Sequence, residues 1–345
     1  MKIKQDFGDS SISQHQQNHI LLSICILSYN QAPDIERLLN SLAPQVTDEI
    51  EIIIRDDSTN NETGLLVESF SNVLPIRYYH GNKEGIDKTV IFLTEEAHGK
   101  FVWWLGDDDV APGGVGQVLD AIRNNHDLTF VWANYQLVGT KDLAINLQSS
   151  RFFSSRDKIL ELGGTALGFV SSTVFKRELA LPGIERARKY IGSFFVNLYL
   201  ILYVISQPGR HYYVHGPVVI CHPASVDEIK AVVVKNPGVI KNDAFEVFGV
   251  NFSRIVREYT TVFSSLAVRR TIKKSFGQTW RGVLVAWVGG WDTPKGKRLR
   301  MIKYFWMFPE CWVALIFFLT PLSVNKILYR IYKALRPNRK LRVVG

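Results

Sequence analysis

The chain has 345 residues, 46% of them hydrophobic and 21% charged, which is enough to bury one or two folded cores and excludes a disordered, collagen-like or small disulfide-rich protein. The formal net charge is +9, but twelve Lys and Arg residues and only one acidic residue lie from position 294 onward. The body is therefore nearly neutral, which disfavours a nucleic-acid-binding protein and assigns the basic excess to the C-terminal segment.

The first eighteen residues are polar, and they contain no hydrophobic stretch of the kind found in a secretory signal. We expect residues 1–18 to be a disordered tail and the folded body to stay in the cytoplasm. The three cysteines, Cys25, Cys221 and Cys311, lie far apart and form no CxxC pair. This spacing indicates a reducing compartment and argues against a zinc site.

Apolar runs alternate with helix-like segments from residue 20 to about residue 135. Short runs rich in β-branched and aromatic residues predict buried strands over 20–27, 51–54, 76–79, 101–105 and 128–135. Apolar residues at helical spacing predict helices over 33–45, 65–70, 88–96 and 115–123. This alternation predicts a parallel, doubly wound sheet, which binds its ligands at the carboxyl ends of the strands.

Three polar clusters follow these strands directly, at residues 28–30, 56–58 and 107–109. In the third cluster, adjacent carboxylates raise each other's pKa, and a divalent cation such as Mg²⁺ or Mn²⁺ relieves the repulsion. A solvated acidic turn or a helix cap explains the same triplet. In the second, a carboxylate suits recognition of a nucleoside, although a polar turn is the alternative. In the first, Tyr29 offers an aromatic face to a base.

Beyond residue 136 the pattern becomes mixed, with predicted helices over 194–205 and 241–280. The apolar segment 304–322 borders on the length of a membrane-spanning helix, but Pro309 and Pro321 interrupt it and both of its flanks are basic. Residues 324–335 then form an amphipathic basic helix. We therefore expect in-plane or re-entrant attachment to a membrane, the alternative being a buried helical layer or an oligomer interface.

The motifs SICILSYNQ, IIIRDDST, GNKEGIDKT and GKFVWWLGDDD, in this order, resemble the inverting family 2 glycosyltransferases of GT-A fold. The similarity is greatest to bacterial members that build O-antigen, capsule and related surface polysaccharides. It covers about residues 20–135 well and extends more loosely to 225. The resemblance implies an α/β protein with a doubly wound mixed sheet and a C-terminal helical, membrane-associating extension.

The same resemblance implies a domain order along the chain. A catalytic domain spans 19–225, and its nucleotide-binding half (19–135) precedes its acceptor half (136–225). A helical extension over 226–300 and a basic, apolar, membrane-associating tail over 301–345 follow.

The resemblance also assigns residues to the donor. It implies that Ser28, Tyr29 and Asn30 border the nucleotide, that Asp57 contacts the base, and that Lys88 contacts the nucleotide or the diphosphate.

For the acidic run, the resemblance implies that Asp108 binds the metal, with Asp107 near the ribose and Asp109 near the sugar in the catalytic site. The family's usual first Asp is replaced by Gly106 here, so this frame can shift by one residue. His222 is a second candidate for the metal or the diphosphate, and a structural, hydrogen-bonded histidine is the alternative.

The implied reaction is metal-assisted transfer of a hexosyl or deoxyhexosyl group from a nucleotide-diphosphate sugar to a hydroxyl of a glycan, expected to be lipid-linked. The implied cofactor is Mn²⁺ or Mg²⁺, and the implied partner is the cytoplasmic face of the inner (plasma) membrane, with peripheral or monotopic attachment. Nucleic acid is not an expected partner. Alternatives are a sugar nucleotidyltransferase and a catalytically degenerate membrane-bound scaffold.

The catalytic base departs from the family pattern. Family members usually supply it as a downstream Asp, but this chain has no acid between Glu185 and Asp227, and Ser193 stands at about the expected position. A serine does not act as a base at neutral pH without help, so the base is left unassigned. Glu185 and Asp227 are its weak candidates.

Overall fold

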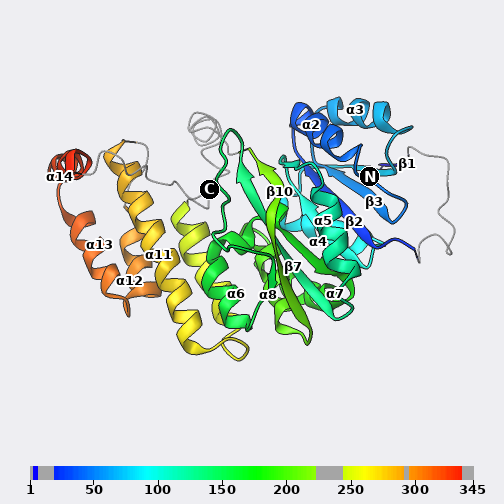
Figure 1. Cartoon of the computed structure of the whole chain (residues 1–345). Helices are drawn as coiled ribbons and strands as arrows, with labels where there is room; N and C mark the ends of the chain where they lie inside the picture. The colour runs from blue at the N-terminus through cyan, green and yellow to red at the C-terminus, as the bar shows by residue number, and fades with distance from the viewer. Residues whose placement is uncertain (1–2, 7–18, 223–243, 291–294, 336–345) are drawn as a thin grey trace. The chain divides into compact units, whose positions relative to one another are not determined.

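The computed structural model describes residues 3–6, 19–222, 244–290 and 295–335. The chain divides into two compact units, each described here by itself (Figure 1). The first unit contains Met1–Ile159 and Ala166–Ala224, and the second contains Leu160–Thr165 and Ser225–Gly345.

A single mixed sheet forms the middle of the first unit, with its described strands in the order β1-β4-β3-β2-β5-β9-β7-β10-β6, while β8 pairs with β10. The strands are β1 (Ile3–Asp6), β2 (Leu22–Ser28), β3 (Ile50–Asp56), β4 (Ile76–His80), β5 (Phe101–Leu105), β6 (Asp109–Val110), β7 (Leu128–Leu137), β8 (Arg151–Phe152), β9 (Thr173–Lys176) and β10 (Arg210–Cys221). The five strands predicted between residues 20 and 135 are confirmed. The expected disordered tail over 1–18 is wrong for residues 3–6, which pair with β4 as β1, and the rest of that tail lies outside the described residues.

The sheet is parallel only in part. Strands β4, β3, β2 and β5 run parallel, as do β7 and β10. Strand β9 runs antiparallel between β5 and β7, and β6 runs antiparallel to β10. The alternation before residue 135 predicts the parallel part correctly. It misses β6, which is only two residues long, and β9, which comes from the later part of the chain.

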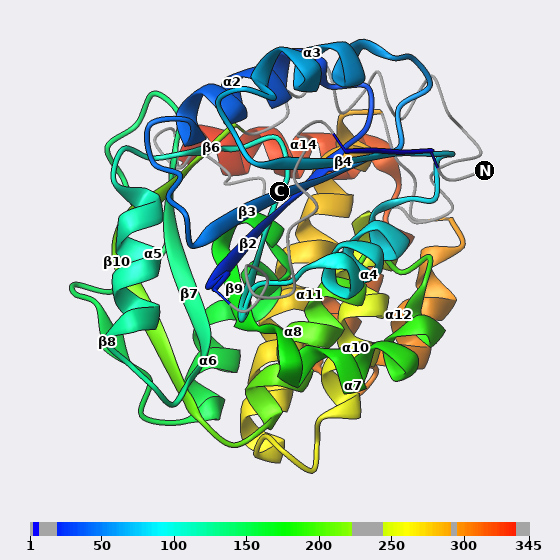
Figure 2. The same ribbon diagram turned by 90° about the vertical axis from the view of Figure 1, so that its right-hand side faces the viewer.

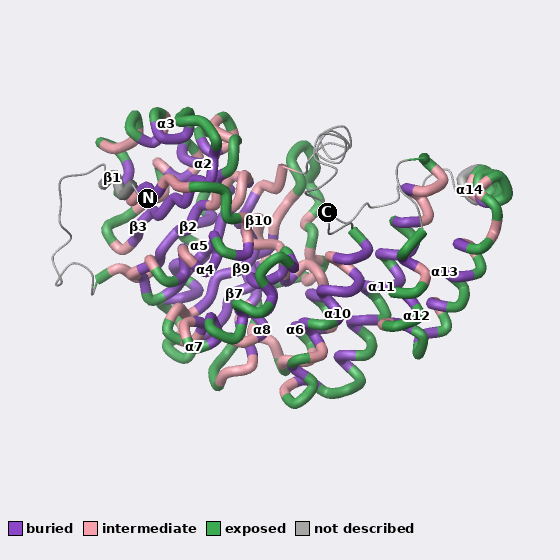
Figure 3. The backbone as a smooth tube through the Cα atoms, turned by 180° about the vertical axis from the view of Figure 1, so that it is seen from behind, coloured by how far each residue is buried: buried purple, intermediate pink, exposed green. Residues whose placement is uncertain are grey.

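Helices cover both faces of the sheet, which explains why its central strands β2 and β3 are buried along almost their whole length (Figure 3). Apolar side chains of α2 (Ala32–Leu42), α3 (Glu62–Phe70) and α5 (Gly114–Arg123) share a buried core with one face (Figure 2). On the other side, α4 (Ile86–Glu96) packs against α7 (Arg177–Ala187) and α8 (Val196–Ser206). The helix α6 spans Arg156–Gly163.

In the second unit the expected helix over 241–280 is not continuous. A π-helix (Phe245–Asn251) leads into α10 (Phe252–Glu258), and α11 (Ser265–Val288) is a separate helix. The side chain of Ser264 accepts a hydrogen bond from the backbone N–H of Ala267 and so caps the start of α11. A helix start, rather than a continuation, therefore lies at this serine. Residues 241–243 of the predicted helix lie outside the described residues.

Three further helices follow: α12 (Lys297–Phe305), α13 (Pro309–Leu319) and α14 (Leu322–Leu335). The predicted interruptions at Pro309 and Pro321 are confirmed, because each proline coincides with a boundary of α13. In the described ranges, no single helix is long and apolar enough to cross a bilayer, and α13 with the first part of α14 passes this test only as a pair bent by 115°.

Candidate active site

The loops after β2 and β3 are joined through Asn30. Its backbone N–H donates to the Oγ of Ser58 at 2.7 Å, and its Oδ1 accepts from the backbone N–H of Thr59 at 2.9 Å. Asn30 has a φ of 54°, in the left-handed region that asparagine tolerates better than most residues. Asn30 is thus a turn residue that fixes two polar loops side by side.

The acidic run after β5 is tied to the same edge by two side chains near the start of α2. The amide of Gln31 donates to Asp107 Oδ2 at 3.0 Å. The guanidinium of Arg37 donates to Asp109 Oδ1 at 2.7 Å and to the backbone oxygen of Asp107 at 2.6 Å. The three polar clusters predicted from the sequence therefore meet at one edge of the sheet. The sequence did not single out Gln31 or Arg37.

The end of β10 brings a fourth segment to these acids. Asp109 pairs with Ile220 in the short antiparallel ladder between β6 and β10, which places His222 beside the acidic run. The backbone N–H of His222 donates to Asp108 Oδ1 at 3.0 Å, and its Nε2 lies 2.8 Å from Asp109 Oδ2. His222 therefore lies against Asp108 and Asp109, and its role toward a metal or a diphosphate stays a prediction.

Asp108 is the buried member of the acidic run. The Oγ of Ser171, from the short helix before β9, donates to its Oδ2 at 2.7 Å. Burial raises the pKa of Asp108, and the hydrogen bonds from Ser171 and His222 only partly oppose this shift. Burial and the neighbouring carboxylate of Asp108 raise the pKa of the Cys221 thiol to about 12. A cation near Asp108 would favour its charged form.

The carboxylates of the acidic run suit a cation that is also bound by a substrate phosphate, rather than a cation bound by protein ligands alone. Within the described ranges, no group of three or more His, Cys, Asp or Glu side chains is arranged to hold a metal ion. Mg²⁺ is usually bound through one or two carboxylates together with substrate phosphates. Asp108 and an oxygen of Asp107 or Asp109 fit that requirement, with the imidazole of His222 at the edge of the set.

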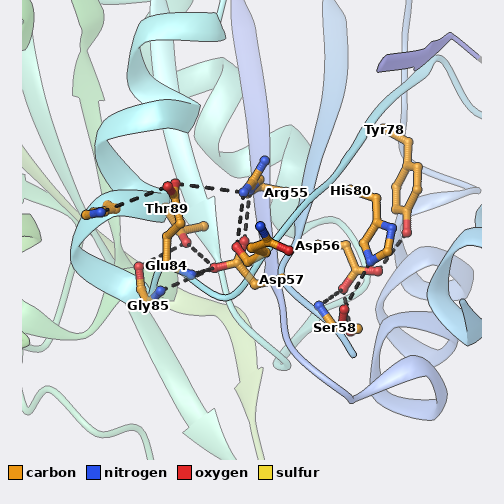
Figure 4. A network of polar contacts seen from close by, with 11 residues as sticks. Arg55, Asp56, Asp57, Ser58, Tyr78, His80, Glu84, Gly85 and Thr89 are labelled. Carbon is orange, nitrogen blue, oxygen red and sulfur yellow. Dashed lines mark hydrogen bonds and ion pairs between the residues drawn. The ribbon is translucent and has the colours of Figure 1, made fainter. Parts of the chain in front are cut away.

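Two carboxylates at the end of β3, those of Asp56 and Asp57, lie in a dense polar network (Figure 4). Asp57 Oδ1 accepts from Arg55 Nε at 2.9 Å, and its Oδ2 accepts from the backbone N–H groups of Glu84 at 3.0 Å and Gly85 at 3.3 Å. Asp57 thereby fastens the loop before α4 to the end of β3. Its contact with a base stays a prediction, and it requires one of these oxygens to accept a further hydrogen bond.

The neighbouring Asp56 faces the other way, into the protein. The hydroxyl of Tyr78 donates to its Oδ2 at 2.6 Å, and Ser58 donates to its Oδ1. Burial, together with the carboxylate of Asp56, raises the pKa of Tyr78. Asp56 is therefore a structural residue that orders the loop bearing Ser58.

Tyr29 projects from the loop after β2 as an exposed ring, and a lysine lies over its face. The Nζ of Lys83 is 3.8 Å from the ring centroid, which is cation–π geometry. Lys88 is half exposed, with its Nζ 3.9 Å from Glu84. The basic contact expected of the GNKEGIDKT motif thus has two candidates, and the motif gave no sign that Lys83 would lie nearer to Tyr29.

Ser28, the remaining predicted nucleotide neighbour, is buried at the end of β2. Its Oγ lies 3.4 Å from the Oγ1 of Thr63 in α3. In this conformation its hydroxyl faces the protein, and its contact with a nucleotide stays a prediction.

Glu185 is unsuited to the role of catalytic base. Its side chain is 90% exposed on α7 and pairs with Arg188, which also pairs with Glu95. Glu95 lies in the last turn of α4, about 13 Å along the helix from Ile86, whereas the N-terminal end of α4 is next to Asp57, which accepts from the backbone N–H of Gly85. Glu185 therefore lies at the wrong end of this layer. The other candidate, Asp227, lies outside the described residues.

The turn that carries Ser193 is held by a carboxylate from α4. Asp87 Oδ2 accepts from the backbone N–H groups of Gly192 at 2.8 Å and Phe194 at 2.9 Å, and its Oδ1 accepts from Val196 at 3.1 Å. Phe194 has a φ of 64°, and α8 begins only at Val196, two residues later than the sequence predicts. This role of Asp87 was not predicted from the sequence. The only sign of it there is a single acidic residue within the motif GIDKT.

We expect Asp87→Ala to lower the free energy of unfolding by about 2–4 kcal/mol, because it strips several buried N–H groups of their acceptor. Asp87→Asn keeps acceptor oxygen and should lose less. Urea denaturation measures both, with Asp120→Ala on the exposed side of α5 as the control. If the urea concentration at the midpoint of unfolding were the same for Asp87→Ala as for the control, Asp87 would not be what holds the turn.

Comparison with known proteins agrees with the motifs. The sequence model described as "Glycosyl transferase family 2" matches residues 23–181. Abequosyltransferase RfbV of Salmonella typhimurium is 25% identical over 228 residues, which cover 59% of this chain and 66% of that protein. An uncharacterized glycosyltransferase, EpsJ of Bacillus subtilis, is 27% identical over 116 residues, or 33% of this chain and 34% of that protein. The chain thus matches less than two thirds of these relatives' lengths.

Solved structures share the fold at low sequence identity. S. aureus TarS 1-349 superimposes with a TM-score of 0.51 at 15% identity, covering 93% of each chain. The same protein in complex with UDP-GlcNAc gives 0.52 at 14% identity, covering 91% of this chain and 92% of that one. At this identity the likeness concerns the fold alone.

Proposed function

Through residues 23–181 this chain belongs to glycosyltransferase family 2, and from that membership we propose that it moves a hexosyl or deoxyhexosyl group from a nucleotide-diphosphate sugar to a hydroxyl of a glycan acceptor. The fold is GT-A-like, an α/β mixed sheet followed by C-terminal helices. The observation that carries the proposal is the meeting of Asn30, Asp107, Asp109 and His222 at the carboxyl edge of the sheet.

The donor diphosphate belongs beside the acidic run. A divalent cation bound there would supply a Lewis acid for the two phosphates. The chain's own contribution is orientation: Gln31 holds Asp107, and Arg37 holds Asp109, before any substrate arrives. Pre-oriented charges act on the leaving group without reorganisation during bond cleavage, which is the main source of electrostatic catalysis.

The nucleoside belongs beside the loops that follow β2 and β3. Tyr29 offers an exposed face on which a base can stack, next to the cationic Lys83. Asp57 is within the same polar edge, where a carboxylate accepts hydrogen bonds from base N–H or ribose hydroxyl groups. The similarity to an abequosyltransferase over 228 residues supports sugar transfer rather than nucleotidyl transfer.

For the acceptor we propose a lipid-linked glycan in surface polysaccharide biosynthesis. The support is the similarity to bacterial glycosyltransferases and the apolar C-terminal helices described below.

A panel of nucleotide sugars tests the proposed function. We expect one donor to raise the melting temperature of the full chain in the presence of Mn²⁺ or Mg²⁺, because a ligand of the native state stabilises it. The same donor should release nucleoside diphosphate, and EDTA should abolish the release. Release of pyrophosphate from a nucleoside triphosphate and a sugar phosphate would instead indicate a nucleotidyltransferase. Binding of no donor would indicate a degenerate scaffold.

A further inference from the structure

Apart from Glu310 in its first turn, the helix α13 is apolar on all sides. One face, Cys311, Ala314, Leu315 and Phe318, is buried within the second unit. The opposite face is exposed, and it also carries large apolar side chains: Trp312 (52%), Val313 (45%), Ile316 (67%) and Leu319 (68%). A helix at a water-exposed surface normally has a polar outer face. The outer face of α13 therefore suits an apolar environment.

The next helix repeats this pattern. Val324, Ile327, Leu328 and Ile331 are all exposed on α14, at the spacing of one helical face. The amide of Asn325 donates to the backbone oxygen of Phe317 at 2.8 Å and so fastens α14 to the end of α13. Two consecutive helices, joined by a polar anchor, thus both expose apolar faces.

Two tryptophans mark the start of the exposed surface of α13. Trp306 is 59% exposed, and its backbone oxygen accepts from Trp312 Nε1 at 3.0 Å. Tryptophan is enriched at the boundary between membrane and water, where its ring is apolar and its N–H is polar. We call the exposed residues of this region the apolar surface. They are Trp306, Met307, Trp312, Val313, Ile316, Leu319, Val324, Ile327, Leu328 and Ile331.

The charges around the apolar surface are almost all positive. Residues 295–335 contain eight Lys and Arg residues and one acid, Glu310, whose Oε1 pairs with Lys273 at 3.0 Å. Lys303, Lys326 and Arg330 are exposed. The sequence adds four more basic residues after position 335. This combination matches a negatively charged lipid surface, such as the cytoplasmic leaflet of a plasma membrane.

We propose that α13 and α14 insert the apolar surface in the plane of an anionic bilayer, at the cytoplasmic face of the membrane, without crossing it. The 115° bend between the two helices and the length of α13, 11 residues, support in-plane binding rather than spanning. A second copy of this chain is the competing occupant, but pairing two such surfaces would oppose two sets of like charges. The proposal does not depend on the donor, the acceptor or the catalytic residues.

Vesicle flotation of the full chain tests the proposal. Wild-type protein should float with phosphatidylcholine vesicles containing phosphatidylglycerol, and much less with pure phosphatidylcholine. The triple variant Trp312→Ser, Ile316→Ser, Leu319→Ser should lower the partition coefficient at least about tenfold. The double variant Lys326→Glu, Arg330→Glu should remove the preference for anionic vesicles. Because all five side chains are exposed, the melting temperatures should stay near that of wild type.

The matched control changes exposed apolar side chains of the first unit. Leu65 and Val73 are each 63% exposed, and Leu65→Ser with Val73→Ser should float as wild type does. Wild-type flotation of the triple variant, or no binding of the wild type to anionic vesicles, would overturn the proposal. It would also be overturned if sedimentation without vesicles showed a wild-type dimer, a monomeric triple variant and equal vesicle binding by both. In that case the surface belongs to a second copy.

Discussion

Asp108→Asn is expected to lower the rate of nucleoside diphosphate release by about 10²–10³-fold, the usual effect of removing one group that stabilises charge in a transition state. The amide keeps the shape of the carboxylate, so its oxygen can still accept from the backbone N–H of His222, and its NH₂ can face Ser171. What is lost is the negative charge beside the diphosphate. The measurement is the steady-state rate with the donor found in the panel.

The same variant should melt at or above the wild-type temperature. Burial raises the pKa of Asp108, so the native state disfavours its charged form. The sign follows from linkage: with a folded pKa above the unfolded one, Asp108 lowers stability as pH rises above its unfolded value of about 3.9. The neutral amide removes this loss at neutral pH. Lost activity with retained stability separates a catalytic role from a structural one.

Asp127→Asn is the matched control for activity, because Asp127 is exposed and lies 3.9 Å from Arg210 at the surface. Its rate should equal that of wild type. Wild-type turnover in Asp108→Asn would refute the assignment of Asp108. Equal loss in both variants would mean that the assay reports net charge rather than the site.

Replacement of Glu51 by alanine should lower the free energy of unfolding by about 3–5 kcal/mol, the effect of breaking a buried ion pair. Glu51 is 2% exposed at the start of β3. Its Oε1 accepts from Ser23 Oγ and the backbone N–H of His98, both at 2.6 Å, and its Oε2 pairs with Arg77 at 2.9 Å. Alanine leaves the guanidinium and these donors without their acceptor. Chemical denaturation followed by circular dichroism measures the loss.

The stabilisation by Glu51 also depends on pH. Burial by itself raises the pKa of Glu51, but the hydrogen bonds from His98 and the charge of Arg77 outweigh it and hold the pKa at about 2. A carboxyl whose folded pKa is depressed stabilises fully above its unfolded value, about 4.3, and loses this effect as pH falls toward the folded value. The difference in stability between wild type and Glu51→Ala should therefore shrink between about pH 4.3 and pH 2.

Glu178→Ala is the matched control for Glu51→Ala. Glu178 pairs with Lys176, but its side chain is 67% exposed, and an exposed pair contributes about 0–1 kcal/mol. Similar losses in the two variants would show that burial does not strengthen the Glu51 network.

The strands between residues 20 and 135 were predictable from sequence because each is a short run rich in β-branched or aromatic residues. The convergence of the polar clusters also followed, since the carboxyl ends of parallel strands share one edge. The side chains that contact the acidic run at 107–109 could not all be predicted from the sequence. Arg37 lies 72 positions from Asp109, and Ser171 lies 63 positions from Asp108, and no local pattern links such positions.

Two further differences have a common cause. Polar side chains mark both places: Asp87 holds the turn before α8, and Ser264 caps the start of α11. Apolar periodicity continues through both places, so a pattern of hydrophobic spacing cannot locate them. The base stays unassigned because Glu185 faces solvent on α7 and the turn that carries Ser193 contains no acid.

The way in which Asp87 holds its turn bears on how this protein can diverge. The carboxylate accepts from main-chain N–H groups at positions 192, 194 and 196, and these contacts do not discriminate between side chains there. The turn can therefore keep its shape while its surface chemistry drifts, provided that positions 192 and 194 still accept positive φ. New side chains could therefore be placed at the exposed positions 191, 192 and 194, with Gly or Asn favoured at 192 and 194, while the buried Ser193, Phe195 and Val196 are kept.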